Sequence, residues 1–385
     1  MEMERIYADH AATTPVIPEV KKTVLEITEK MFGNPSSIHA FGREARAVVD
    51  GARQTASRSI GAKFHEIIFT SGGTEADNLA WIGTALANRG RGKHLITTSI
   101  EHHAVLKTAE FLESLGFEVT YLPVDESGAV KADAVKRALR DDTILVSVMF
   151  ANNETGVIQP VKEIGELLQN HPAYFHTDAV QAYGHIPIDV NELHIDLLSV
   201  SAHKMNGPKG AGFLYVRDGV KLAPLIHGGE QERRRRAGTE NVAAIAGFGK
   251  AIEIAMKRMA ANKAHHERLR DAFIRKLREE GVDFAINGDP EQSLANIINL
   301  SFPGTRTDQV LVNLDLEGIA ASSGSACTAG SLEPSYVLKA MYGENSPRIG
   351  NSVRFSFGYG NTVEQMEILG EKCAAVVKRL SSDGR

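Results

Sequence analysis

The sequence predicts an α/β fold built around a mostly parallel sheet. In the middle of the chain, short β-rich runs alternate with amphipathic helical runs, which is the pattern of strand–helix–strand units. Polar motifs follow several predicted strands where they end, and ligands bind beyond the carboxyl ends of strands in such sheets. At 385 residues the chain is also long enough for two domains and a large core.

The predicted strands come in a regular order along the chain. Six β-rich runs are expected to form them, at 67–70, 94–98, 118–122, 144–149, 173–177 and 196–200. The first run leads into a helix from Glu75 and the second into a helix from His102. The runs are short and rich in Val, Ile, Leu and Thr, as buried strands are.

A long helical pattern rich in Ala, Lys, Arg and Glu runs from Val242 towards Glu280. We interpret it as the link between a large domain, residues 15–260, and a smaller one. The smaller domain is expected to combine residues 1–14 with residues 261–385. The last five residues, from Ser381, are expected to be disordered.

Composition excludes several classes of function. The net charge of −5 gives no electrostatic reason to expect a nucleic acid or membrane partner. The charged start has no apolar segment behind it, so no secretory signal is expected. Two cysteines, Cys327 and Cys373, cannot form a disulfide framework and lack CxxC spacing. These observations together predict a cytoplasmic protein.

Lys204 is the first candidate for a chemical role. It follows the strand 196–200 and His203, and a Gly/Pro turn at 207–210 comes after it. Burial at such a position would lower the pKa of the amine and favour its use as a nucleophile. A lysine that forms a Schiff base with pyridoxal phosphate needs these properties. A surface lysine in a loop would have the same local sequence.

Two further motifs fit the same cofactor. The turn Gly72-Gly73-Thr74 lies between a strand and a helix, where free N–H groups bind phosphate. Asp178 follows another strand and can pair with a pyridine nitrogen, and Gln181 can reach the phenolic oxygen of the ring. An N-terminal helix turn without a ligand, and an aspartate that caps a helix, are the alternatives.

His102 and Asn153 also follow strands. His102 can stack on a cofactor ring and exchange protons near neutral pH. The pair His102-His103 could instead suggest a metal, but adjacent residues do not share a helix face and no HExxH pattern is present. Asn153 can reach the cofactor, although a plain turn would look the same.

A basic run and a run of small residues complete the candidates. A basic run such as 233–236 is usually only a solvated face. Here the run precedes Thr239 and could deliver that residue to a phosphate or a subunit interface. The small residues 321–330 cannot anchor a loop by burying apolar area, so this loop is predicted to be mobile. Cys327 in this loop suits a thiolate that enters and leaves a site, whereas Cys373 has the pattern of ordinary helix packing.

With these motifs together, the chain resembles the cysteine desulfurases of the NifS/IscS group, within the class V aminotransferases of fold type I. The resemblance runs from Tyr7 to Ser356, and its most specific pieces are 33–37, 70–78, His203-Lys204 and 322–327. It implies a large domain with a mostly parallel seven-stranded sheet flanked by helices, and a smaller α+β domain with a mobile cysteine loop at 322–332. The length of that loop resembles group I.

The resemblance also implies roles for individual residues. Lys204 would carry the cofactor, pyridoxal 5'-phosphate, and Cys327 would accept the sulfur. The cofactor would be bound by Gly73, Thr74, His102, Asn153, Asp178, Gln181, Ser201, His203, Lys204 and, from the second subunit of a homodimer, Thr239. Arg354, with Asn34 near it and Asn153 beside the substrate, would hold the substrate carboxylate, for which a guanidinium is well shaped.

The implied reaction removes sulfur from L-cysteine, with L-alanine and a persulfide on Cys327 as products. The acceptor protein would be an iron–sulfur scaffold or a tRNA thiolation enzyme. No resident metal is expected, although Cys327 could transiently bind an iron–sulfur cluster. An aminotransferase or a selenocysteine lyase on the same fold, and a non-catalytic sulfur-transfer scaffold, are the alternatives.

Overall fold

The structure, a computed structural model, describes residues 5–324 and 334–382. Its largest sheet has seven strands. In spatial order these are β2 (Ile67–Thr70), β8 (Gly212–Val216), β7 (Leu197–Ser201), β6 (Tyr174–Asp178), β5 (Thr143–Ser147), β3 (His94–Thr98) and β4 (Glu118–Leu122). Neighbours from β4 to β7 are parallel, whereas β8 is antiparallel to both β7 and β2. The predicted α/β class with a mostly parallel seven-stranded sheet is therefore confirmed.

β8 was not among the predicted strands. Its sequence, Gly-Phe-Leu-Tyr-Val, is an uninterrupted apolar run, and all five residues are buried. A short run of this kind has no alternation that would distinguish a strand from a buried helical turn.

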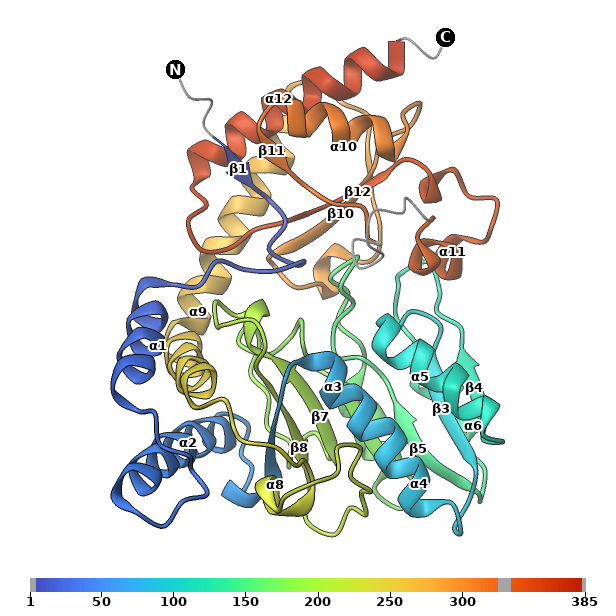
Figure 1. Ribbon diagram of the computed structural model, residues 1–385. Helices are drawn as coiled ribbons and strands as arrows, with labels where there is room; N and C mark the ends of the chain where they lie inside the picture. The colour runs from blue at the N-terminus through green and yellow to red at the C-terminus, as the bar shows by residue number, and fades with distance from the viewer. Residues whose placement is uncertain (1–4, 325–333, 383–385) are drawn as a thin grey trace.

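Helices cover both faces of the sheet (Figure 1). The helices of the described residues are α1 (Pro18–Lys30), α2 (Ala40–Ser59), α3 (Gly73–Asn78), α4 (Thr84–Asn88), α5 (His103–Ser114), α6 (Ala132–Ala138), α7 (Val161–Leu168), α8 (Gln231–Arg234), α9 (Val242–Glu279), α10 (Thr307–Leu316), α11 (Tyr336–Tyr342) and α12 (Val363–Ser382). Of these, α10 and α12 pack in a second core rather than on this sheet. The strand pleat explains the layers, because successive side chains point to opposite faces. Ile68 and Leu197 pack with α3 to α5, whereas Ile67 and Leu198 pack with α2, α7 and α9.

A second core lies around a smaller sheet, in which β10 (Ile297–Ser301) pairs antiparallel with β9 (Ala285–Ile286) and β12 (Ser352–Ser356). β1 (Ile6–Tyr7) pairs parallel with β11 (Ile319–Ala320) beside it. Figure 1 shows β1, α10 and α12 gathered with these strands on one side of the larger sheet.

The helix α9 belongs to both cores, as its predicted linking role requires. Phe248 and Ile252 pack in the first core, and Leu269 and Phe273 pack in the second. The change from one core to the other therefore falls within this helix. The boundaries at residues 14/15 and 260/261 stay predictions.

Two kinds of feature are absent from residues 5–324 and 334–382. None of the helices there combines the length and the apolar character needed to cross a bilayer. The same ranges contain no group of three or more His, Cys, Asp or Glu side chains arranged to hold a metal ion.

Candidate active site

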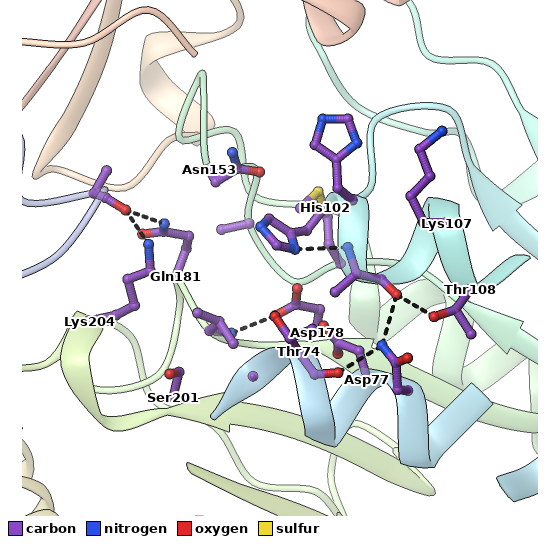
Figure 2. A pocket seen from close by; sticks show the side chains of 18 of the residues that line it. Thr74, Asp77, His102, Lys107, Thr108, Asn153, Asp178, Gln181, Ser201 and Lys204 are labelled. Atoms are coloured by element: carbon purple, nitrogen blue, oxygen red, sulfur yellow. Dashed lines mark hydrogen bonds between the residues drawn. The ribbon is translucent and has the colours of Figure 1, made fainter. Parts of the chain in front are cut away.

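A cavity of about 690 Å³ lies at the carboxyl ends of β2, β3, β5, β6 and β7. Ten of the residues proposed from the sequence line it: Gly73, Thr74, His102, Asn153, Asp178, Gln181, Ser201, His203, Lys204 and Arg354. Figure 2 shows several of these side chains converging from separate elements. The parallel strands end at one edge, so motifs far apart in the sequence meet there.

Lys204 lies in the cavity wall in a single helical turn, Ala202–Lys204, that follows β7. Its Nζ donates to the carbonyl oxygens of Ala11 and Ala12, at 2.5 and 2.9 Å. Gln181 Nε2 donates to the same Ala11 oxygen at 3.0 Å, and Figure 2 shows the two side chains next to each other. The surface-loop alternative for Lys204 is therefore wrong.

Asp178 is the last residue of β6 and is buried. Its Oδ1 accepts a hydrogen bond from the backbone N–H of Val180 at 2.9 Å, and turns rather than a helix follow it. Burial raises the pKa of Asp178 to about 6. A carboxylate under this desolvation gains from a cationic partner in the cavity.

The turn between β2 and α3 approaches its neighbours closely. A Cβ added at Gly73 would lie 2.7 Å from Val180 Cγ2, so a larger residue would require the Val180 side chain to move. Gly72 has a φ of +152°, and a Cβ on it would be 3.7 Å from Ser201 Oγ. The first N–H groups of α3 have no partners within the helix and are available to an anion beside Ser201.

His102 caps α5, and Figure 2 shows it across the cavity from Lys204. Its Nδ1 accepts from the backbone N–H of Ala104 at 3.1 Å, so the neutral ring carries its hydrogen on Nε2. Burial, and then the nearby Lys204 charge, lower the pKa of His102 to about 4. The ring is therefore neutral at pH 7.

Three buried polar atoms on residues lining this cavity have no hydrogen-bond partner within the described ranges. They are Asn153 Oδ1, Asp77 Oδ1 and Arg354 Nε. The two terminal nitrogens of Arg354 are occupied, Nη1 by Asn153 O and Nη2 by Asp9 Oδ1, both at 2.8 Å. Buried polar groups are normally paired, so these atoms fit a polar ligand in the cavity.

A buried network beneath Asp178 was missed by the sequence analysis. His176 Nε2 is 3.0 Å from Ser199 Oγ, and its Nδ1 is 2.8 Å from Ser147 Oγ. Burial lowers the pKa of His176 to about 3, and burial with the nearby Asp178 charge raises that of Asp77. Because His176 is neutral, its 3.6 Å approach to Asp77 is not an ion pair. The sequence signal that could have indicated this network is the presence of a histidine, His176, and a serine, Ser199, inside otherwise apolar strands.

Two proposed residues lie away from the cavity in this single chain. Asn34 is exposed between α1 and α2, where its Oδ1 accepts from Ser36 N at 2.9 Å. Thr239 is exposed after α8. Arg236, three residues before Thr239, is joined to Glu75 of α3 at 2.8 Å, so the chain leading to Thr239 is held near the turn Gly72-Gly73-Thr74.

Of the two cysteines, the structure describes Cys373 but not Cys327. Cys373 is fully buried on α12 in the second core, where burial raises the pKa of its thiol to about 12. This placement confirms its interpretation as a packing residue. Cys327 and most of the predicted cysteine loop lie outside the described residues.

Glu101, next to His102, gives the site a pH-dependent stability. It is wholly buried; its Oε1 accepts from Thr98 Oγ1 at 2.8 Å and from Met149 N at 2.9 Å. Burial raises its pKa to about 8 from 4.5. Folding therefore favours the protonated acid, and this stabilisation is lost as the pH rises from 4.5 through 8.

Glu101→Gln, which cannot ionise, is expected to gain melting temperature relative to the unmodified protein as the pH is raised. The comparison is between melting temperatures of both proteins at pH 5 and pH 8.5. Glu110→Gln, an exposed residue of α5, is the control and should show no such trend. A constant difference between Glu101→Gln and the unmodified protein across this range would contradict the assignment.

Comparisons with known proteins agree with this geometry. Residues 6–369 match the family model described as aminotransferase class-V. A Bacillus subtilis relative is 58% identical over 379 residues, covering 98% of this chain and 100% of the relative. A protein named cysteine desulfurase IscS from Dictyoglomus turgidum is 50% identical, covering 97% of this chain and 95% of its own length.

Solved structures show the same likeness. A NifS-like protein superposes with a TM-score of 0.91 at 37% identity, covering 98% of this chain and 100% of that one. A structure named SspA in complex with cysteine superposes with a TM-score of 0.81 at 37% identity, covering 91% of this chain and 98% of that one.

Proposed function

Since this chain belongs to the class V aminotransferase family and is a cysteine desulfurase within it, we propose that the cavity described above binds pyridoxal phosphate and removes sulfur from L-cysteine. One observation carries the assignment of the site. The Lys204 amine, the Asp178 carboxylate and the glycine turn at the start of α3 line one cavity from three separate strand ends.

The residues present fit this cofactor. Ser201, His203 and the N–H groups of Gly73 and Thr74 would hold the phosphate, and Asp178 would pair with the pyridine nitrogen. The neutral ring of His102 would cover one face, and Gln181 would reach the phenolic oxygen. Thr239 would contact the phosphate from the second subunit of a homodimer. When bound, the cofactor supplies an aldehyde that condenses with amines and a ring that withdraws electrons.

The chain's own residues then position and deprotonate the substrate. The Lys204 amine, which lines the cavity, would take the proton from the substrate Cα. Asp178 stays ionised above its pKa of about 6, so near neutral pH it can stabilise positive charge on the pyridine nitrogen. His102, with its hydrogen on Nε2, faces the cavity as a donor.

Arg354 is the proposed anchor for the substrate carboxylate, with Asn153 and Asn34 as further contacts. It is almost fully buried, and its unpaired Nε already belongs to a cavity-lining side chain. An incoming carboxylate can accept one hydrogen bond from Nε and a second from Nη2, the nitrogen that also donates to Asp9. The pairing with Asp9 keeps the guanidinium oriented before the substrate arrives.

Cys327 would accept the sulfur. Its thiolate attacks the substrate Sγ, so that the new S–S bond forms as the Cβ–S bond breaks. The electron pair of the broken bond stays with the substrate, which becomes L-alanine once its Cβ has taken up one proton and its Cα has regained the proton that was removed. The persulfide would pass to an iron–sulfur scaffold or a tRNA thiolation enzyme in the cytoplasm. No direct contact with nucleic acid or a membrane is needed.

Purified protein loaded with pyridoxal phosphate should form alanine from L-cysteine at a rate equal to that of sulfide release in the presence of a thiol. Removing the cofactor should abolish both products, and adding it back should restore them. Transfer of the amino group to a 2-oxo acid, without sulfide, would instead identify an aminotransferase. Faster turnover of selenocysteine, independent of Cys327, would identify a selenocysteine lyase.

A further inference from the structure

A buried carboxylate outside the cavity, that of Glu154, lies in the turn that follows β5. Glu154 is fully buried, and it does not line the cavity. Asn152 Oδ1 accepts from the backbone N–H groups of Glu154 and Thr155, at 2.9 and 3.0 Å, which fixes the turn. The Glu154 side chain therefore projects from a turn that these two hydrogen bonds hold in place beyond the end of β5.

The carboxylate contacts the chain just after the segment that carries Cys327. Ser335 Oγ donates to Glu154 Oε2 at 2.5 Å. The same hydroxyl accepts from the backbone N–H of Leu338 at 3.0 Å, and so caps α11. Glu154 is thus bonded to the residue that begins this helix.

The same carboxylate also contacts the chain just before that segment. A Cβ added at Gly324 would lie 1.9 Å from Glu154 Oε2 and 2.1 Å from its Cδ. The φ of Gly324 is not in the left-handed region, so the requirement for glycine comes from space alone. The backbone at 324 is therefore packed directly against the Glu154 carboxylate.

Both contacts lie next to the proposed substrate site. Ser322 exchanges two backbone hydrogen bonds with Arg354, at 3.2 and 2.7 Å. Arg354 Nη1 in turn donates to Asn153 O, and Asn153 directly precedes Glu154. The two ends of the cysteine segment are thus joined to the strand and the turn that hold the substrate arginine.

We propose that Glu154 is a positioning residue, whose single carboxylate contacts residues 324 and 335 and fixes the chain on both sides of residues 325–333, beside Arg354. The inference rests on the proposed function in one respect, that Cys327 is the sulfur acceptor. The contacts themselves involve described residues and can be tested without reference to sulfur chemistry.

The variants Glu154→Gln and Glu154→Ala distinguish the effect of losing the hydrogen bond from Ser335 from the effect of losing the carboxylate charge. An amide oxygen can accept the Ser335 hydrogen bond, so Glu154→Gln is expected to behave as the unmodified protein. Glu154→Ala removes both contacts. The rate of amide hydrogen exchange in the loaded enzyme should then rise about tenfold at two places, the amide of Leu338 and the amides of residues 320–324. It should remain unchanged in α5.

Gly324→Ala supplies the decisive comparison. Alone, its Cβ must displace the Glu154 carboxylate, so it should raise exchange at Leu338 about as much as Glu154→Ala does. In the double variant Gly324→Ala with Glu154→Ala, the added methyl meets no carboxylate, and the two effects should not add. Additive effects, or Glu154→Ala without effect on exchange at either end, would overturn the proposal.

The rate of alanine formation provides the functional readout. It should fall about tenfold or more in Glu154→Ala and recover in Glu154→Gln, with the cofactor absorbance unchanged in both. A loss of both rate and cofactor in Glu154→Ala, without rescue by glutamine, would indicate a merely structural role. If Cys327→Ser retained full activity, the proposed function would fail, whereas the hydrogen-exchange result would still decide the role of Glu154.

Discussion

Replacing Lys204 with alanine should give a folded, colourless protein that does not form alanine from cysteine. The side chain enters the cavity and is held by two backbone oxygens of residues 11 and 12. Removing it takes away both the amine that would carry the cofactor and the base that would deprotonate the substrate. The rate should fall by roughly 10⁴-fold, the upper range for loss of a positioned proton-transfer group.

A covalent readout makes this prediction independent of turnover. Borohydride reduction of the loaded protein should fix the cofactor to the peptide that contains Lys204, which mass spectrometry can locate. Lys209→Ala is a matched control, because Lys209 is close in sequence but exposed in a later turn, and the variant should keep colour, labelling and activity. Labelling on any lysine other than Lys204 would refute the assignment.

The parts of this site that could be predicted from the sequence are those marked by local patterns, such as strand ends and tight turns. Lys204, Asp178 and the glycine turn each follow a buried strand, so the ends of parallel strands brought them together as expected. The identity of Gly73 is explained by its contact with Val180. These predictions succeeded because strand ends and tight turns are local in sequence while the sheet order is regular.

Other features depend on contacts that sequence spacing does not encode. The pairing of Arg354 with Asp9 joins β12 to the turn after β1, from opposite ends of the chain. His176 and Asp77 approach one another only because α3 packs on β7, the strand next to β6 in the sheet. Similarly, nothing in the small-residue run around Gly324 indicates that Glu154 packs against it. Such long-range contacts require the folded arrangement of both cores.

Asn34 is assigned to the substrate carboxylate near Arg354, and Thr239 is assigned to the phosphate from a second subunit. Both residues are exposed in the single chain, and neither lines the cavity. Their assigned contacts with substrate and phosphate therefore stay predictions. The link between Arg236 and Glu75 does show that the segment leading to Thr239 is held beside the turn Gly72-Gly73-Thr74 of its own chain.

Cys327→Ser should separate the two halves of the reaction. The variant is expected to bind pyridoxal phosphate and to change its absorbance on addition of cysteine, because Lys204, Asp178 and Arg354 are untouched. It should form alanine and sulfide more than about a hundredfold more slowly, since a serine hydroxyl is a far weaker nucleophile than a thiolate. An unperturbed thiol titrates at about 8.5, so the rate in the unmodified protein should rise with pH towards that value.

The second cysteine supplies the control for this experiment. Cys373 is fully buried in the second core, and Cys373→Ala should leave the rate and the spectral change as they are. After one turnover without added thiol, mass spectrometry should find one extra sulfur on the peptide that contains residue 327 and none on that of residue 373. Equal activity of Cys327→Ser and the unmodified protein would mean that sulfur leaves the cavity by another route, because no other cysteine in this chain is accessible to accept it.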